Sequence, residues 1–125
     1  MIQYIVPLLL LTATVQAAPG QCRAIDGDSY TCFGERIRLE NIDTPELHGR
    51  CARETDLANS ANRFAQASLD NVEQIIVTVH ERRPRDRYGR TLAKISIDGN
   101  DLGEQLIRLG FARRYHGERR QSWCD

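Results

Sequence analysis

Four cysteines constrain the fold of this chain more than any other feature of its sequence. Cys22 and Cys32 lie five residues on either side of Gly27, so a hairpin that turns at this glycine would place them opposite one another on two strands. Four cysteines allow three pairings, and this geometry favours Cys22–Cys32 together with Cys51–Cys124. The second bridge would close a loop of about 70 residues and add about 4 kcal/mol of stability in the chain-entropy model. A structural zinc site is the competing interpretation, but no C-x-x-C motif supports it.

The start of the chain has the composition of an export signal. The first 17 residues carry no charged side chain, and 5–11 form an apolar run that is too short for the roughly 20 residues of a membrane span. Val15 and Ala17 fit the small residues that precede a signal peptidase site. We therefore predict a signal peptide at 1–17 and one domain at 18–125, in a periplasmic or secreted protein whose disulfides persist after export. An uncleaved hydrophobic anchor is the alternative.

Short extended segments separated by turn residues dominate the first part of the predicted domain. Period-two alternation of polar and apolar residues predicts three strands that follow one another as a meander, at 22–25, 29–33 and 36–39. The turn-rich stretch 41–53 then reads as a loop. A β-branched run at 74–79 and a second alternating segment at 91–97 predict two further strands.

Two helices and an extended ending complete the predicted fold. Apolar residues at helical spacing predict a helix over about 54–70. Asp101 can cap a short second helix that ends at Gly110, with 111–115 extended after it. The apolar residues expected to face inward from this second helix are Leu102, Leu106 and Leu109. The order β-β-β-α-β-β-α predicts a mainly β fold of the α+β class, a five-stranded OB-fold barrel.

Charge is balanced overall but not along the chain. The 17 basic residues equal the 17 acidic ones, yet acidic residues prevail before residue 80 and basic residues after it. All basic residues except Lys94 are arginines, whose planar guanidinium matches phosphate. Codon usage also raises arginine content, so the composition alone is weak support for a phosphate-bearing partner.

Four short segments concentrate residues capable of chemistry. Each has an ordinary structural interpretation when taken alone: a hairpin turn, an outward strand face, a helix start and a solvated charged loop. The segments are Asp26-Gly27-Asp28, Arg36-Ile37-Arg38-Leu39, Asp43-Thr44-Pro45-Glu46 and Asp86-Arg87-Tyr88-Gly89-Arg90.

Together, these segments resemble the staphylococcal nuclease (thermonuclease) family in order and spacing, over about 22–115. The resemblance implies an OB-fold nuclease that uses Ca²⁺, which prefers carboxylate and carbonyl oxygens. Its implied metal ligands are the carboxylates of Asp28 and Asp43 and the backbone carbonyl of Thr44. Its implied catalytic residues are Arg38, Glu46 and Arg90. These residue types suit phosphodiester hydrolysis, since cations must offset the charge that develops on the phosphate oxygens.

The resemblance also implies a substrate and an end product. Family members cleave both DNA and RNA as endonucleases and leave 3′-phosphate ends. By this resemblance Arg87, Tyr88 and Tyr115 would contact the substrate, with the aromatic rings available for stacking on bases. We expect a monomer without stable membrane association. A secreted, non-catalytic OB-type module that binds nucleic acid is the alternative function.

Overall fold

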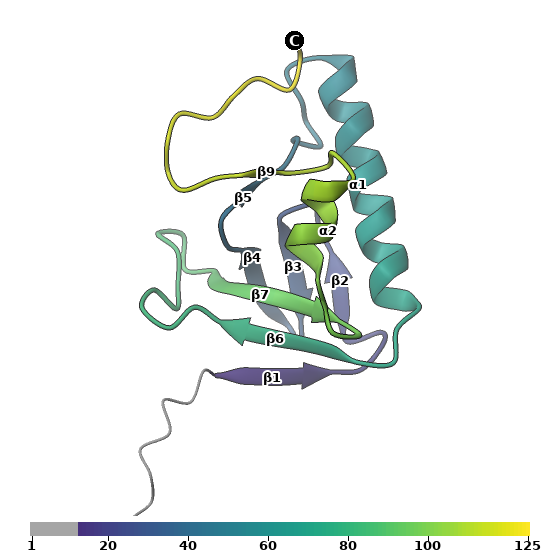
Figure 1. Ribbon diagram of the computed structural model, residues 1–125, viewed down its shortest axis with the longest axis vertical. Helices are drawn as coiled ribbons and strands as arrows, with labels where there is room; N and C mark the ends of the chain where they lie inside the picture. Colours follow the sequence, from purple (N-terminus) through teal and green to yellow (C-terminus); the bar gives the residue numbers. More distant parts are fainter. Residues whose placement is uncertain (1–12) are drawn as a thin grey trace, which may run out of the picture.

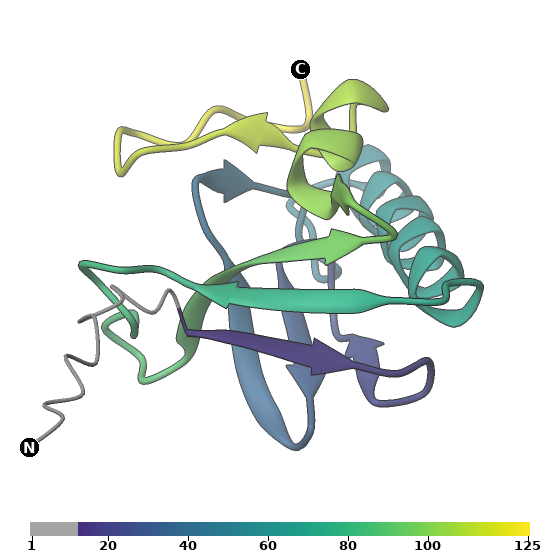
Figure 2. The same cartoon turned by 60° about the horizontal axis from the view of Figure 1, so that its bottom comes forward.

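The fold is a mixed α+β arrangement of short strands and two helices. The computed structural model describes residues 13–125. A curved sheet lies beside the long helix α1, and β5 and β9 form a small separate ribbon at the opposite end of the molecule from β1 (Figures 1 and 2). In chain order the elements are β1 (Thr14–Ala17), β2 (Cys22–Ala24), β3 (Ser29–Cys32), β4 (Glu35–Leu39), β5 (Ile42–Asp43), α1 (Ala52–Asp70), β6 (Ile75–Val79), β7 (Thr91–Ile97), β8 (Asn100–Asp101), α2 (Leu102–Arg108) and β9 (Arg113–Arg114).

The cysteine hairpin folds as predicted. β2 and β3 are antiparallel with Cys22 directly opposite Cys32, and these two residues form a disulfide. Cys51 and Cys124 form the second disulfide. β3 continues into β4 through a turn in which Phe33 and Gly34 both have positive φ, and β4 completes the predicted meander. Both predicted pairings are therefore present in the structure.

The main sheet is open rather than closed. Its strand order is β1-β6-β7-β4-β3-β2, with β8 paired to β7, so β1 and β2 are its two edges. The mixed α+β class is confirmed, but the strands within residues 13–125 do not close into the predicted five-stranded barrel. Asn41 has a φ of 60°, and this left-handed residue turns the chain out of β4 into β5, which pairs with β9 instead.

Three short strands lie where no strand was predicted. β5 falls within the stretch that reads as a loop, and β8 falls within the turn that precedes α2. β1 lies at the end of the predicted signal peptide 1–17 and pairs with β6, with Ala17 buried. Residues 1–12 of that predicted peptide lie outside the described residues, and its cleavage stays a prediction.

The helices present one apolar stripe each. Cys51 caps α1 by accepting from the backbone N–H of Glu54, and small residues such as Ala61 and Ala65 are fully buried, which lets α1 pack closely on the sheet. Asp101 caps α2 as predicted. The inward prediction is correct for Leu102 and Leu106, but it is wrong for Leu109, which is 52% exposed. Leu109 follows the last helical residue, where the chain turns away from the core at Gly110.

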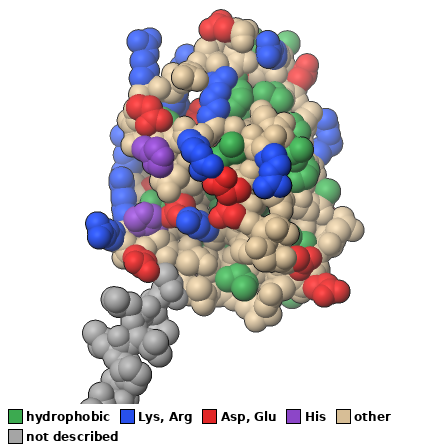
Figure 3. Space-filling model, viewed as in Figure 1, with side chains coloured by type: hydrophobic (Ala, Val, Ile, Leu, Met, Phe, Trp, Pro, Cys, Tyr) green, Lys and Arg blue, Asp and Glu red, His purple; other side chains and the backbone are tan. Residues whose placement is uncertain are grey.

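The surface is polar and of mixed charge. Figure 3 shows Lys and Arg side chains interspersed with Asp and Glu side chains over one face of the molecule. Among residues 13–125, neither helix combines the length and the apolar character needed to cross a membrane.

Candidate functional site

The first two motifs meet because a glycine allows two backbone segments to touch. Asp28 is the last residue of the β2–β3 turn, Asp43 ends β5 and Thr44 follows it; all three are buried. A Cβ atom added at Gly27 would lie 2.9 Å from the Cβ atom of Thr44. Only glycine permits this approach without a shift, so the turn that carries Asp28 packs directly on the segment that carries the other two predicted metal ligands.

Asp26 fixes the shape of that turn. Its Oδ1 atom accepts hydrogen bonds from the backbone N–H groups of Asp28 and Ser29, at 3.1 and 2.9 Å. Burial and the neighbouring Asp28 raise the pKa of Asp26 to about 7. The turn therefore places the Asp26 carboxyl group beside that of Asp28, whose negative charge disfavours ionisation of Asp26.

Arg38 is a buried cation that joins three segments. Its guanidinium donates to the backbone carbonyls of Leu39 and, at 2.8 Å, Ile42. Its Nη2 atom also lies 3.4 Å from Oδ2 of Asp28. Arg36, two residues earlier on β4, is exposed, so only the second arginine of this motif belongs to the site.

Arg90 is connected to the same aspartate through a serine. Its Nη1 atom donates to Oγ of Ser29 at 3.0 Å, and this hydroxyl donates to Oδ1 of Asp28 at 3.2 Å. On its other side the Nε atom of Arg90 donates to Oδ2 of Asp86 at 2.7 Å. Burial acts to raise the pKa of Asp86, yet the hydrogen bonds from the backbone and guanidinium of Arg90 lower this pKa overall. Arg90 and Arg38 thus approach Asp28 through its two different oxygens.

The predicted aromatic contact lies on the surface beside Arg90. Tyr88 is 69% exposed. The Cζ atoms of Arg87 and Arg90 lie 4.9 and 5.7 Å from the centroid of its ring. The exposed ring of Tyr88 and the guanidinium of Arg87 thus lie beside the partly buried Arg90, next to the site.

Glu46 extends from a loop that a buried glutamate organises. Glu54 accepts from the backbone N–H groups of Glu46 at 3.1 Å and Arg50 at 2.9 Å. The side chain of Glu46 is itself 54% exposed. Partial burial and the charge of Asp28 raise the pKa of Glu46, while Arg120 opposes this rise. A glutamate with a raised pKa at the edge of an acidic cluster is suited to accept a proton.

Replacing Glu54 with Gln is expected to destabilise the protein. Hydrogen bonds from the backbone N–H groups of Arg50 and Glu46 lower the pKa of Glu54. The resulting stability is present above the unfolded-state pKa and is lost as pH falls through the lowered folded-state pKa. An amide cannot accept with both of its terminal atoms, so we expect a loss of about 1–3 kcal/mol at pH 7.

Urea denaturation of Glu54→Gln and native protein between pH 2.5 and 7 measures this effect. The difference in the free energy of unfolding between native protein and Glu54→Gln should become smaller below about pH 4.5, the range in which glutamate protonates. Asp56→Asn, at an exposed position of the same helix, is the matched control and should leave stability unchanged. A constant gap at every pH would contradict the proposed role of the Glu54 charge.

Residues 116–125, which we call the closing segment, supply two side chains to the site that the motifs did not indicate. The indole Nε1 atom of Trp123 donates to Oδ2 of Asp43 at 3.1 Å. Arg120 lies 3.7 Å from Oδ1 of Asp43 and 3.4 Å from Oε1 of Glu46. Tyr115, predicted to contact substrate, has the guanidinium of Arg120 above its ring at 5.5 Å. The structure therefore brings this tyrosine near the site, but as a partner of Arg120.

The donor set fits a hard divalent cation. Within residues 13–125, no three His, Cys, Asp or Glu side chains form a group able to hold a metal ion. The predicted set contains only two such side chains, Asp28 and Asp43, and takes its third oxygen from a backbone carbonyl, so it depends on added water. Burial raises the pKa of Asp43, and the charge of Asp28 raises it further. A bound cation would relieve this repulsion, and all-oxygen ligation matches the chemistry of Ca²⁺.

Fold and site together define a class of protein: an OB-like α+β domain that gathers carboxylates and arginines beside an exposed aromatic ring. The family model described as staphylococcal nuclease homologue matches residues 36–123, and the chain belongs to this family. The predicted resemblance to that family is thereby confirmed.

Relatives with several different names share this similarity. The thermonuclease of Staphylococcus intermedius is 33% identical over 95 residues, which cover 73% of this chain and 55% of that protein. The endonuclease YncB of Bacillus subtilis is 30% identical over 95 residues, 73% of this chain and 44% of that protein. The succinoglycan biosynthesis protein ExoI of Rhizobium meliloti is 34% identical over 109 residues, 83% of this chain and 57% of that protein. The chain spans about half the length of these relatives.

Proposed function

We propose that this protein is an exported, calcium-dependent endonuclease that hydrolyses phosphodiester bonds of DNA and RNA. The observation that carries the proposal is the contact network in which Arg38 and Arg90 both reach Asp28, directly and through Ser29. Membership of the staphylococcal nuclease family, which includes a thermonuclease and an endonuclease among its named relatives, supports it. The two disulfides are compatible with export and with a periplasmic or secreted location.

Asp28, Asp43 and the carbonyl of Thr44 would hold the Ca²⁺ ion. When bound, the ion offsets negative charge on the scissile phosphate and orients it. Three protein oxygens leave positions in the coordination shell for water and for a phosphate oxygen, because calcium takes six to eight ligands. Both aspartates are buried, so the surrounding packing restricts the rotation of their side chains.

Glu46 and the two arginines would carry out the remaining steps. Glu46 accepts a proton from water as the water oxygen bonds to phosphorus, and the bond from phosphorus to the 5′ oxygen breaks. The 5′ oxygen takes a proton from solvent water and leaves as a hydroxyl, and the phosphate stays on the 3′ end. Arg38 and Arg90 donate charge-assisted hydrogen bonds to the phosphate oxygens and stabilise the charge of the transition state.

Substrate binding would rely on phosphate contacts and stacking. Tyr88 is exposed, so a base could stack on its ring while Arg87 binds a neighbouring phosphate. Tyr115 would contact the strand on the far side of the site. Neither type of contact reads a base sequence, so we propose that the enzyme accepts both DNA and RNA and prefers single strands.

Cleavage is expected to require both calcium and Asp43. The test incubates the purified, oxidised protein with labelled single-stranded DNA in CaCl₂ or in EGTA, alongside Asp43→Asn. We expect cleavage only for the native protein in calcium, because the variant loses an anionic ligand. Asp70→Asn, at the exposed end of α1, is the matched control and should cleave normally.

The same experiment tests the alternative function. Tight, salt-sensitive binding of DNA without cleavage would support a non-catalytic nucleic-acid-binding module. Calcium-independent cleavage at the native rate would instead contradict the proposed role of the metal ion. Sedimentation of the same sample should show a monomer.

A further inference from the structure

The closing segment, residues 116–125, reaches into the candidate site from the far end of the sequence. It leaves β9, loops outward and returns to the N-terminal end of α1, as Figure 1 shows in yellow. Trp123 and Arg120 then contact the carboxylate of Asp43 through its two different oxygens. A cavity of about 100 Å³ lies between this segment and the loop of Asp43 and Glu46. One of its walls is therefore supplied by the closing segment.

A disulfide and the side chain of Arg113 hold Trp123 in place. The Cys51–Cys124 disulfide attaches the next residue to the start of α1. The guanidinium of Arg113 lies 3.7 Å from the centroid of the Trp123 ring. The same guanidinium donates to the backbone carbonyls of Gln121 at 3.2 Å and Ser122 at 3.0 Å. The disulfide and the contacts of Arg113 thus hold the indole ring so that its N–H points at Asp43.

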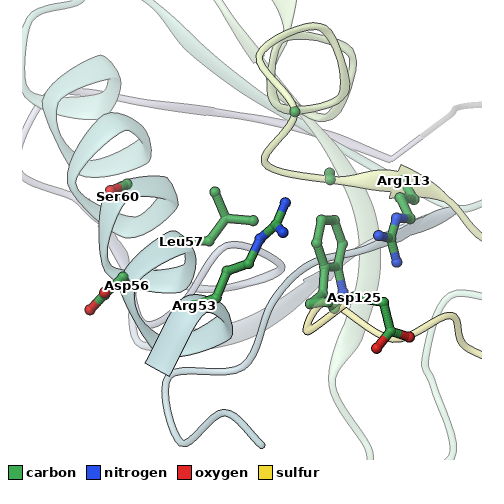
Figure 4. A pocket seen from close by; sticks show the side chains of 9 residues that line it. Arg53, Asp56, Leu57, Ser60, Arg113 and Asp125 are labelled. Carbon is green, nitrogen blue, oxygen red and sulfur yellow. The ribbon is translucent and has the colours of Figure 1, made fainter. Parts of the chain in front are cut away.

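Trp123 lines a larger cavity as well as this small one. It lines a second cavity of about 810 Å³, which Arg53, Asp56, Leu57 and Ser60 border from α1 and Arg113 and Asp125 border from the opposite side (Figure 4). Removing the closing segment would open Asp43 to this larger space and to solvent. The position of the ring therefore determines the surroundings of a proposed metal ligand.

An indole N–H is suited to hold a metal-binding carboxylate. It donates one hydrogen bond and cannot accept, so it satisfies Oδ2 of Asp43, while Oδ1 lies 3.7 Å from Nε of Arg120, beyond hydrogen-bond distance, and can still ligate a cation. It carries no charge that would repel the cation. Hydrogen-bond donors outside a metal's ligands orient those ligands, and their loss typically weakens metal affinity by about 10- to 100-fold.

We propose that Trp123 is a positioning residue for the calcium site, and that the Cys51–Cys124 disulfide keeps it there. This inference rests on the proposed function, since it assigns Asp43 to the metal. Cys51 is also the N-cap of α1, and Glu54 of that helix fixes the loop of Glu46. The disulfide therefore connects the segment that contacts Asp43 to the helix that positions Glu46, and its reduction would weaken calcium binding.

Calcium titration by isothermal calorimetry tests the first part without measuring cleavage. Trp123→Phe retains an aromatic ring and loses only the N–H donor, so we expect a Kd for calcium about 10- to 100-fold higher than that of the native protein. A merely structural role would lower the melting temperature and leave the Kd unchanged. Phe111→Leu, a half-buried aromatic position outside the site, is a control for loss of packing and should retain the native Kd.

Two double variants test the disulfide. Cys51→Ser with Cys124→Ser should weaken calcium binding as Trp123→Phe does, whereas Cys22→Ser with Cys32→Ser should not. Trp123 is the only tryptophan, so its emission reports the position of the closing segment and should shift toward longer wavelengths only in the first double variant. The near-native far-UV circular dichroism expected of both variants would show that they are folded.

The outcomes separate this inference from the proposed function. Equal calcium affinity in native protein and Trp123→Phe would overturn the inference and leave the proposed nuclease intact. Tighter calcium binding after loss of Cys51–Cys124 would also overturn it, because the closing segment would then obstruct the site. A native protein that binds calcium with the expected dependence on Trp123 but cleaves nothing would contradict only the proposed function. Absence of any calcium binding would contradict both.

Discussion

Glu46→Gln is expected to lower the rate of single-stranded DNA cleavage by about 10²- to 10⁴-fold, the usual contribution of a positioned general base. Glutamine keeps the size of the side chain but cannot accept a proton from water. Because the Glu46 side chain is 54% exposed and its backbone N–H is held by Glu54, the change should leave the fold intact. Initial rates at saturating calcium, together with thermal melts, measure both effects.

A matched control makes the loss at Glu46 specific. Glu35→Gln makes the same chemical change at an exposed position of β4, next to the cysteine hairpin, and should cleave at the native rate. The pH profile adds a second readout: the rate of the native protein should rise with pH through the raised pKa of Glu46, and this limb should be absent in the variant. A Glu46→Gln rate within threefold of native would remove Glu46 from the proposed mechanism.

Local patterns predicted much of the fold because the interactions behind them are local. Cys22 and Cys32 are paired by one hairpin, so their spacing around Gly27 already indicates the register. β7 spans the same residues as the predicted strand. Alternation of polar and apolar residues marks where the strand begins, and the Asp-Gly turn that follows marks where it ends. The open sheet was not predictable in this way. Its edges β1 and β2 do not pair with each other, and β5 leaves β4 through a left-handed turn at Asn41, a single residue that no period reveals.

The parts of the site that were missed come from distant residues. Trp123 and Asp43 are 80 positions apart, and Arg120 and Glu46 are 74 apart, with no periodic pattern to connect them. The predicted Cys51–Cys124 pairing indicated that the closing segment returns to α1, but not which side chains it delivers. The contact between Asp86 and Arg90, by contrast, has a local signal, because the two residues are only four positions apart.

Motif residues and their supporting residues share one electrostatic arrangement. Burial and the charge of Asp28 raise the pKa values of Asp43 and Glu46, and each of the three carboxylates has a cation within reach in Arg38 or Arg120. A bound cation would relieve the repulsion among these carboxylates. This accounts for the otherwise costly burial of two aspartates and one arginine in a small domain.

Arg90→Lys is expected to lower cleavage by about 10²- to 10³-fold, the range seen when one donor to a charged transition state is removed. Arg90 uses separate nitrogens for Asp86 and Ser29, and its remaining N–H groups can still donate to a phosphate. Lysine has a single nitrogen on a flexible stem. It can keep the ion pair with Asp86 or bind phosphate, but it cannot hold the planar geometry that serves both.

The kinetic pattern of Arg90→Lys should separate phosphate stabilisation from simple binding. We expect most of the loss in kcat, with a smaller change in KM, because the guanidinium would act on charge that develops in the transition state. Arg83→Lys makes the same change in the same loop at an exposed residue and should retain native kcat. Retention of native kcat in Arg90→Lys would show that a positive charge alone suffices there, and the role of the paired guanidinium nitrogens would have to be abandoned.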